Sequence, residues 1–125
     1  VVDVRGNPGG LLTAGVDAAA LFLKQGDVIV SQVDKTGVPR TERAYVDGPY
    51  SDGGKVRVVV LADGDTASAA EVFAAALKGN GRAKVVTPTG GPTFGKGVVQ
   101  TVRPLGSVEE DKGGVKVTVA RYLTP

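Results

Sequence analysis

The sequence predicts an α/β fold in which short strands alternate with two helices, and three observations support this prediction. Residues 56–61 form a nearly continuous β-branched run, the pattern of a strand that is buried on both faces. Residues 69–77 follow as an Ala-rich segment with apolar residues at helical spacing. Turn-rich segments divide the remaining chain into further short elements, which favours a sheet with mixed strand pairing.

The first half of the chain is predicted to contain a strand, a helix and a hairpin. The strand covers 1–5 and ends at a Gly-Pro breaker. The helix is predicted over 11–24, because apolar side chains recur there in one stripe, formed by Leu12, Val16, Ala19, Ala20 and Leu23. Residues 27–33 and 40–46 are the predicted strands of a hairpin around a short turn.

The second half continues the alternation after the helix. Residues 83–87 form a predicted strand, and 88–97 form a Gly-rich loop. Residues 98–103 and 115–123 are predicted to pair as a hairpin whose charged tip is 109–114. The predicted order is therefore β-α-β-β-β-α-β-β-β.

Length and charge limit the classes of protein that this chain can represent. Its 125 residues fit one domain with a real core. The chain has no Met and starts abruptly within a strand, so we expect residues 1–125 to be one domain that is an excerpt, truncated at both ends. The net charge is only +2 and its Lys and Arg residues are scattered, so we expect no nucleic-acid partner. No apolar run reaches the ~18 residues of a membrane span, so membrane association would need other segments.

The absence of histidine and cysteine excludes several kinds of active site. A Ser-His-Asp triad, a histidine-ligated metal, thiol catalysis and thiolate zinc sites cannot be built from this chain. We therefore expect no metal and no cofactor. Any nucleophile must be Ser, Thr, Lys or a carboxylate, and any base must be Lys, Asp, Glu or Tyr.

Ser68 stands at the predicted junction between the buried strand and the Ala-rich helix. Backbone N–H groups are unpaired at a helix start, and the helix dipole favours negative charge there, so an oxyanion would be stabilised. Ser68 and Glu71 also have the spacing of a capping box, which would be a structural role alone. The local pattern leaves both interpretations open.

Lys96 lies in the Gly-rich loop and supports two functional interpretations. The loop nearly matches the phosphate-binding pattern, but Gly97 stands where a hydroxyl is required, and a strand rather than a helix is predicted to follow. The second interpretation is a general base, because an apolar setting provided by Phe94 and Val98 favours a neutral lysine. Gln100 would lie on the same strand face and could orient the amine. An ordinary solvated lysine is the structural alternative.

The Gly-rich breaker at 6–10 is the third candidate segment. Its structural interpretation is a strand-to-helix turn in which glycine supplies positive φ. Its functional interpretation is that one of its backbone amides donates to an oxyanion, with the second donor coming from the N–H of Ala69. Two such donors and a Ser-Lys pair would make an acyl-transfer site without histidine.

Together these segments resemble the carboxyl-terminal processing, or tail-specific, serine peptidases. Residues 2–11 resemble the family's D-L-R-x-N-P-G-G-L stretch, and 66–72 resemble its S-A-S-A-S-E-I turn. Residues 81–83 and 93–100 resemble G-R-A and T-F-G-K-G-x-V-Q. Residues 118–125 resemble the closing T-x-A-R-Y-x-T-P. The likeness runs from end to end in the same order.

The resemblance implies a fold, a reaction and a set of site residues. The fold would be a crotonase- or ClpP-like α/β superhelix, and the protein a serine endopeptidase that cuts proteins near an apolar C-terminus. Its location would be the periplasm, the cell surface or the thylakoid lumen. The implied catalytic residues are Ser68 as nucleophile, Lys96 as general base and Gln100 as the residue that positions the lysine. The implied oxyanion hole is formed by Gly9 or Gly10 together with Ala69.

The chain departs from the family pattern, and two of the departures, at residue 79 and at 88–92, support an alternative function. Gly79 stands where the family commonly has an acidic residue, and the excess length between serine and lysine falls at 88–92. The family's PDZ domain, which captures substrate tails, is not present in this segment. The alternative is a non-catalytic module that binds apolar ligands or peptides on the same fold, since a fold alone does not fix function.

Overall fold

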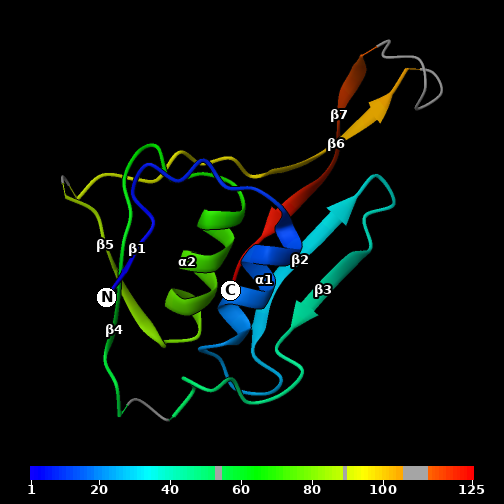
Figure 1. Cartoon of the computed structure of the whole chain (residues 1–125). Coiled ribbons are helices and arrows are strands. Elements are labelled where there is room, and N and C mark those ends of the chain that lie inside the picture. The colour runs from blue at the N-terminus through cyan, green and yellow to red at the C-terminus, as the bar shows by residue number, and fades with distance from the viewer. Residues whose placement is uncertain (53–54, 89, 106–112) are drawn as a thin grey trace.

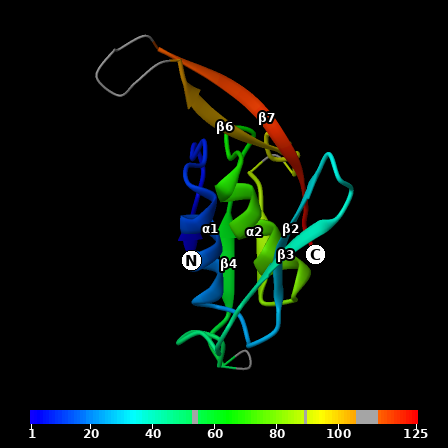
Figure 2. The same ribbon diagram turned by 90° about the vertical axis from the view of Figure 1, so that its right-hand side faces the viewer.

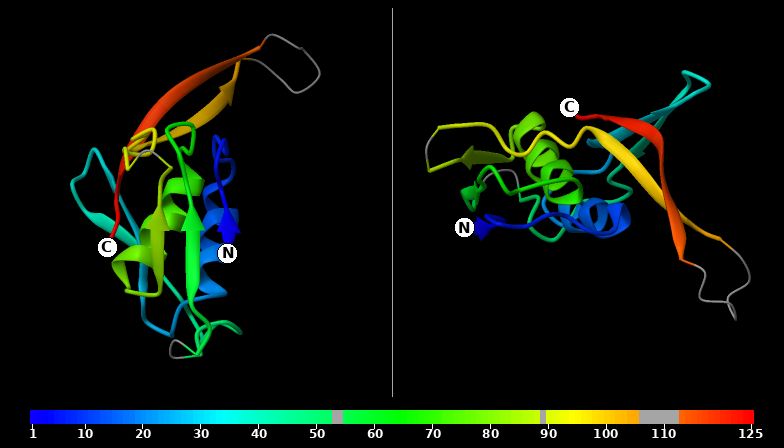
Figure 3. Two further views of the ribbon diagram at one scale, coloured as in Figure 1. Left: turned by 90° about the vertical axis from the view of Figure 1, so that its left-hand side faces the viewer. Right: turned by 90° about the horizontal axis from the view of Figure 1, so that it is seen from above.

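The computed structural model describes residues 1–52, 55–88, 90–105 and 113–125, and it arranges them in three layers (Figure 1). A three-stranded parallel sheet has the order β1 (Val2–Asp3), β4 (Val58–Leu61), β5 (Ala83–Val86). Helices α1 (Leu12–Ala20) and α2 (Ala69–Gly79) form the middle layer, as both views of Figure 3 show. On their other side lies an antiparallel sheet with the order β3 (Pro39–Arg43), β2 (Val28–Asp34), β7 (Gly114–Leu123), β6 (Val98–Pro104).

The predicted order of elements and the mixed strand pairing are confirmed in the described residues. Both predicted hairpins pair antiparallel, β2 with β3 and β6 with β7. The predicted charged tip of the second hairpin lies outside the described residues between 109 and 112. The finer prediction, a crotonase- or ClpP-like superhelix, stays a prediction.

Helix α1 ends at Ala20, although the apolar stripe predicted a helix as far as Lys24. The reason is a competing segment from far along the chain. The N–H of Gly48 donates to the carbonyl of Leu23 at 2.9 Å, and the N–H of Tyr50 donates to the carbonyl of Leu21 at 2.9 Å. These bonds from a distant loop satisfy the carbonyls that a helix end leaves free, and the chain turns away there.

The core lies between the helix layer and the two sheets. It consists of apolar side chains that are almost completely buried, including Leu23, Ile29, Val30, Val60, Val72 and Leu77. In β4, Val58 and Val60 are buried whereas Val59 and Leu61 are half-buried, so one face of the predicted two-sided strand is less covered than expected. The β6–β7 hairpin extends away from this core, as Figures 1 and 2 show.

The loop that carries Lys96 is positioned by the two sheets together. It leaves β5 in the parallel sheet and enters β6 in the antiparallel sheet. On this path it crosses the N-terminal end of α2, where Ser68 lies (Figure 1). The topology therefore brings two segments that are far apart in sequence to one end of one helix.

Helices α1 and α2 contact closely because residue 15 is a glycine. A Cβ atom built on Gly15 would lie 2.7 Å from the carbonyl oxygen of Ala69 and 3.2 Å from its Cβ. Ala69 is the first residue of α2 and follows Ser68 directly. The close contact between the helices therefore helps to fix the start of α2.

We predict that Gly15→Ala destabilises the protein although alanine is the better helix former. Helix propensity would favour alanine by about 1 kcal/mol, whereas overpacking a tight contact costs about 1–3 kcal/mol. Urea denaturation should show a net loss of stability. Gly64→Ala is the control, because a Cβ there would meet no atom within 4 Å. Equal or greater stability of Gly15→Ala would show that the helices have room to separate.

Candidate functional site

Ser68 occupies a strained position at the junction of β4 and α2. Its backbone has φ 57° and ψ −122°, and among the described residues it is the only non-glycine with positive φ. It is 9% exposed. A serine in this conformation persists only when its surroundings hold it there, and such strain concentrates at functional sites. A sharp strand-to-helix turn is also the geometry that presents a nucleophilic serine in α/β-hydrolases.

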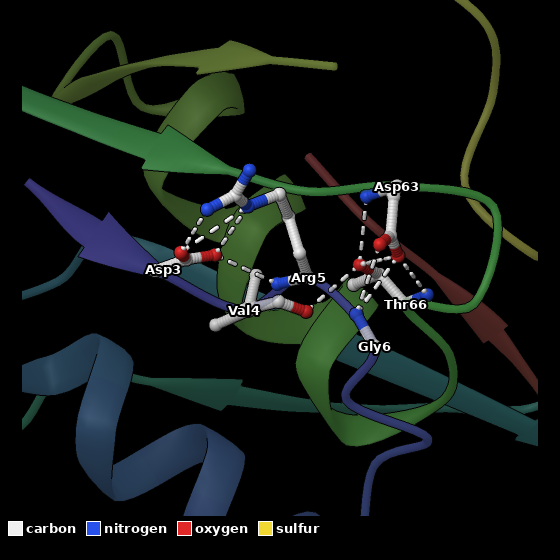
Figure 4. Close-up of polar contacts among 6 residues, drawn as sticks. All are labelled: Asp3, Val4, Arg5, Gly6, Asp63 and Thr66. Carbon is white, nitrogen blue, oxygen red and sulfur yellow. Dashed lines mark hydrogen bonds and ion pairs between the residues drawn. The ribbon is translucent and has the colours of Figure 1, made fainter. Parts of the chain in front are cut away.

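The turn before Ser68 is anchored to the end of β1 by Asp63 and Thr66 (Figure 4). The fully buried Thr66 donates its hydroxyl proton to the carbonyl of Val4 at 2.8 Å. The carboxylate of Asp63 accepts the N–H of Gly6 at 2.9 Å and the N–H of Thr66 at 3.0 Å. The bond from Gly6 is the main cause that holds the pKa of Asp63 below its ordinary value. The side chain of Asp63 is therefore a carboxylate at neutral pH.

The predicted oxyanion loop at 6–10 lies directly against Ser68. A Cβ atom on Gly9 would lie 2.6 Å from the carbonyl oxygen of Ala67 and 2.7 Å from Cβ of Ser68, and Gly9 has φ +91°. Only glycine fits this approach. The N–H of Ala67 also donates to the carbonyl of Asn7 at 2.9 Å. The structure thus brings together the two loops from which the oxyanion donors were predicted.

Of the two glycines proposed as donors, Gly10 is the one whose N–H is uncommitted. The N–H of Gly9 donates to Oδ1 of Asn7 at 2.9 Å. None of the hydrogen bonds among the described residues uses the N–H of Gly10 or of Ala69. Gly10 also borders open space. The pair of amides available to an oxyanion is therefore that of Gly10 and Ala69.

Glu71 joins the serine turn to the lysine loop through four hydrogen bonds. Its Oε2 accepts the N–H of Ser68 at 2.8 Å and the N–H of Lys96 at 3.0 Å. Its Oε1 accepts the hydroxyl of Thr93 at 2.6 Å and the N–H of Gly95 at 2.7 Å. The capping box predicted for Ser68 and Glu71 is present, and the same carboxylate has a second function that the sequence pattern did not indicate.

These bonds also set the charge of Glu71. Burial by itself raises the pKa of this half-buried carboxyl. The hydrogen bonds from Thr93, Gly95, Ser68 and Lys96 together outweigh burial and hold the pKa below its ordinary value. Glu71 is therefore a carboxylate at neutral pH and accepts all four bonds at once.

Ser68 and Lys96 line one cavity of about 750 Å³. Glu71, Thr93 and Tyr122 contribute to the same wall. Among the described residues no hydrogen bond joins the side chains of Ser68 and Lys96 directly. The apolar setting predicted for the lysine does not include Phe94, whose side chain is 65% exposed. The extra length at 88–92 thus leaves Lys96 facing the same cavity as Ser68.

Gln100 lies apart from this cavity. It is exposed on β6, and its amide donates to Oγ1 of Thr118 at 3.5 Å. It is not among the residues that line the cavity. The β6–β7 register shifts between Val99 and Gln100, so pairing with β7 changes just before this residue. The structure brings Ser68, Lys96, Ala69 and the glycine loop together and leaves Gln100 outside the group.

Tyr122 belongs to the site although no local sequence signal marked it. It comes from β7 and lines the cavity with Ser68 and Lys96. Burial raises the pKa of its hydroxyl, while an interaction with the side chain of Ser68 opposes that rise. Its only sequence signal was the closing stretch of the resemblance, where it stands within 118–125.

A second cavity, of about 330 Å³, borders the glycine loop and shares no lining residue with the first. Gly9, Gly10 and Ala69 contribute to its wall. The remaining wall is mostly apolar and includes Leu21, Phe22 and Phe73. An apolar side chain next to a carbonyl held by Gly10 and Ala69 would have room to be buried here.

Gly79, the departure from the family pattern, has a structural explanation. It is the last residue of α2, at the end opposite Ser68. A Cβ atom there would lie 2.6 Å from Cβ of Pro125 and 2.7 Å from its carbonyl oxygen. A side chain at position 79 would therefore displace Pro125.

The described residues contain no group of three or more Asp or Glu that could hold a metal ion, and no helix long and apolar enough to cross a membrane.

Comparison with known proteins gives consistent results along the whole chain. Residues 1–125 match the family described as peptidase family S41. A carboxyl-terminal-processing protease of Picosynechococcus sp. is 45% identical over 125 residues, which are 100% of this chain and 27% of that protein. The chloroplastic C-terminal processing peptidase of Tetradesmus obliquus is 43% identical over 125 residues, 100% of this chain and 25% of that protein.

A solved structure extends the likeness to the fold. The photosystem II D1 C-terminal processing protease matches with a TM-score of 0.76 and 39% identity, over 98% of this chain and 29% of that chain. A Bacteroides fragilis structure described as a putative S41 protease has a TM-score of 0.64 at 18% identity, covering 98% of this chain and 32% of that chain, and it shows the fold alone. The chain spans about a quarter of the length of the curated relatives that it matches.

We predict that Glu71→Gln disturbs the site because an amide cannot accept four donors. Whichever way the amide is turned, its NH2 group faces at least one backbone N–H that loses its acceptor, and the remaining bonds lose the charge that strengthens them, a loss of about 1–3 kcal/mol. Stability at pH 7 should fall by that amount. Glu42→Gln on β3 is the control and should leave stability nearly unchanged.

The same pair of proteins tests the pH dependence. Because the pKa of Glu71 is lowered by folding, its stabilising contribution is complete above its ordinary pKa of 4.5 and is lost as the pH falls through the lower folded value. The stability difference between wild type and Glu71→Gln should therefore shrink below pH 4.5. A difference that stays constant down to pH 2 would contradict the role of the carboxylate.

Proposed function

The chain belongs to peptidase family S41, and we propose that it forms the catalytic core of a serine endopeptidase that cleaves proteins near an apolar C-terminus. The observation that carries this proposal is the tether at Glu71, which holds the Ser68 turn and the Lys96 loop at one cavity. The proposed nucleophile and base share this cavity, and the approach of Gly9 to Ser68 supports the glycine loop and Ala69 as the source of the oxyanion donors, without histidine.

The first half of the proposed reaction is acylation. Lys96, as the general base, takes the proton of the Ser68 hydroxyl as Oγ attacks the scissile carbonyl carbon. The carbonyl oxygen becomes an oxyanion, which accepts hydrogen bonds from the N–H groups of Gly10 and Ala69. The C–N bond then breaks, and the protonated Lys96 gives its proton to the leaving amine.

The second half is hydrolysis of the acyl-enzyme. Lys96, which has given its proton to the leaving amine, takes a proton from a water molecule that attacks the ester carbonyl. The same two amides hold the second oxyanion, and the C–O bond to Ser68 breaks. Lys96 returns the proton to Oγ, which restores the resting enzyme. The dipole of α2 supports both oxyanions, because its N-terminus favours negative charge.

Gln100 has a smaller part in this proposal than the resemblance implied. A residue that positions Lys96 must reach its amine, and Gln100 is bonded instead to Thr118. We keep Gln100 as a proposed positioning residue on the resemblance of 93–100 to the family motif alone. In the arrangement described here, the loop that carries the lysine is held by Glu71 through backbone N–H groups.

The proposed substrates are proteins with apolar C-terminal regions. The mostly apolar second cavity beside Gly10 and Ala69 supports this choice, since it can bury an apolar side chain next to the scissile carbonyl. Three of the similar proteins named above are C-terminal processing proteases by name, one of them chloroplastic and one named for photosystem II D1. By the same reasoning we propose an extracytoplasmic location, in the periplasm, on the cell surface or in the thylakoid lumen.

We predict that Ser68→Ala and Lys96→Ala fold normally but leave a protein with an apolar tail uncut. Removing either member of a nucleophile–base pair should lower kcat by at least about 10³-fold. Cleavage is followed by electrophoresis and mass spectrometry of the products. Ser31→Ala and Lys24→Ala are the controls, because neither residue lines the cavity. Cleavage at an undiminished rate in either site variant would defeat the assignment.

A further inference from the structure

Tyr122 is the side chain of the candidate site for which the mechanism above gives no role. It lies on β7, 54 positions after Ser68, and lines the cavity that Ser68 and Lys96 share. Its ring is partly buried and packs against the hydrophobic core. The hydroxyl end of a tyrosine with a packed ring is held in place, so its position in the cavity is well defined.

Two sets of backbone contacts fix Tyr122 relative to the lysine loop. Its N–H donates to the carbonyl of Gly97 at 3.0 Å, and Gly97 follows Lys96 directly. On the other side, Tyr122 is in register with Gln32 of β2 within the antiparallel sheet. Because Tyr122 lies on a strand that pairs with β2, it is held more rigidly than a residue on a loop, as a catalytic group requires.

We propose that Tyr122 is a further catalytic residue whose hydroxyl donates a hydrogen bond to Oγ of Ser68. The proposal rests on the proposed function, because it assigns a partner to the nucleophile. A serine hydroxyl has one proton and two acceptor lone pairs. One lone pair accepts the N–H of Glu71 in the capping box. If the other accepts the proton of Tyr122, the serine's own proton remains available to point at Nζ of Lys96.

The same bond acts during the attack. As Lys96 removes the proton from Ser68, negative charge develops on Oγ until the bond to the carbonyl carbon forms. The Tyr122 hydroxyl stabilises this charge as a fixed donor and keeps its own proton throughout, so the proton balance of the mechanism is unchanged. Burial keeps the pKa of Tyr122 above its ordinary value, with only a partly opposing effect from Ser68, so the donor is protonated at neutral pH.

The test is Tyr122→Phe, which removes one oxygen atom and retains the ring that packs against the core. We expect kcat for an apolar-tailed protein to fall about tenfold, the value of one good hydrogen bond, with KM nearly unchanged. The rate at which a fluorophosphonate labels Ser68 should fall by a similar factor. Tyr45→Phe is the matched control, because Tyr45 is 79% exposed and outside the cavity.

A second replacement separates a chemical role from a structural one. Substituting 3,5-difluorotyrosine at position 122 preserves shape and lowers the pH at which the hydroxyl ionises. If the hydroxyl must donate to Ser68, cleavage should decline on the alkaline side at a lower pH than in wild type. A structural hydroxyl would leave the pH profile unmoved.

The outcomes distinguish this proposal from the proposed function. If wild type cleaves and Tyr122→Phe cleaves equally well, or the fluorinated protein keeps the wild-type pH profile, the role of Tyr122 is overturned. If wild type and the Ser68→Ala variant behave alike, neither cutting the protein, the proposed function itself fails. Should Tyr122→Phe fold poorly, the pH profile of the fluorinated protein decides the matter alone.

Discussion

The carboxylate of Glu71 is the interaction on which the arrangement of the site depends. It binds backbone N–H groups of two segments that the sequence places 28 positions apart, the turn of Ser68 and the loop of Lys96. A carboxylate is suited to this task, because its two oxygens accept several charge-assisted hydrogen bonds at once. Without Glu71 the four donors would be unpaired at the edge of a cavity. Because an unpaired donor costs free energy, their bonds to the carboxylate hold the two loops in place.

This tether also explains how Ser68 can be both a helix cap and a nucleophile. In the capping box the N–H of Ser68 donates to Glu71 and the Ser68 side chain accepts the N–H of Glu71, so the hydroxyl keeps its own proton while it lines the cavity. Positive φ at a serine is strained, and the strain is supported from three sides, by Glu71, by the Gly9 approach and by the anchor of Thr66 to β1. The structural and functional interpretations of this residue are therefore parts of one arrangement.

Much of the fold could be predicted because hydrophobic periodicity and turn residues are local signals. The order of elements and α2 followed from them, whereas the end of α1 did not, because the carbonyls of Leu21 and Leu23 are taken by a loop that is distant in sequence. The local pattern predicted only a capping role for Glu71, because its bonds to Thr93 and Gly95 join residues that are distant in sequence. Alternation predicted Gln100 on the face of Lys96, but β6 begins at Val98 and its pairing shifts between Val99 and Gln100, so the alternation does not extend from Lys96 to Gln100. Tyr122 carried no local signal.

The proposed roles of Ser68 and Lys96 are tested most directly by a crystal structure of the protein with a peptidyl boronic acid that has an apolar side chain. We expect a covalent bond from boron to Oγ of Ser68 and a boronate oxygen ~2.7–3.1 Å from the N–H groups of Gly10 and Ala69. We also expect Nζ of Lys96 within ~2.6–3.2 Å of Oγ, with the four bonds of Glu71 intact. A boronate bound elsewhere, or an adduct on Ser68 with Lys96 turned out to solvent, would contradict it.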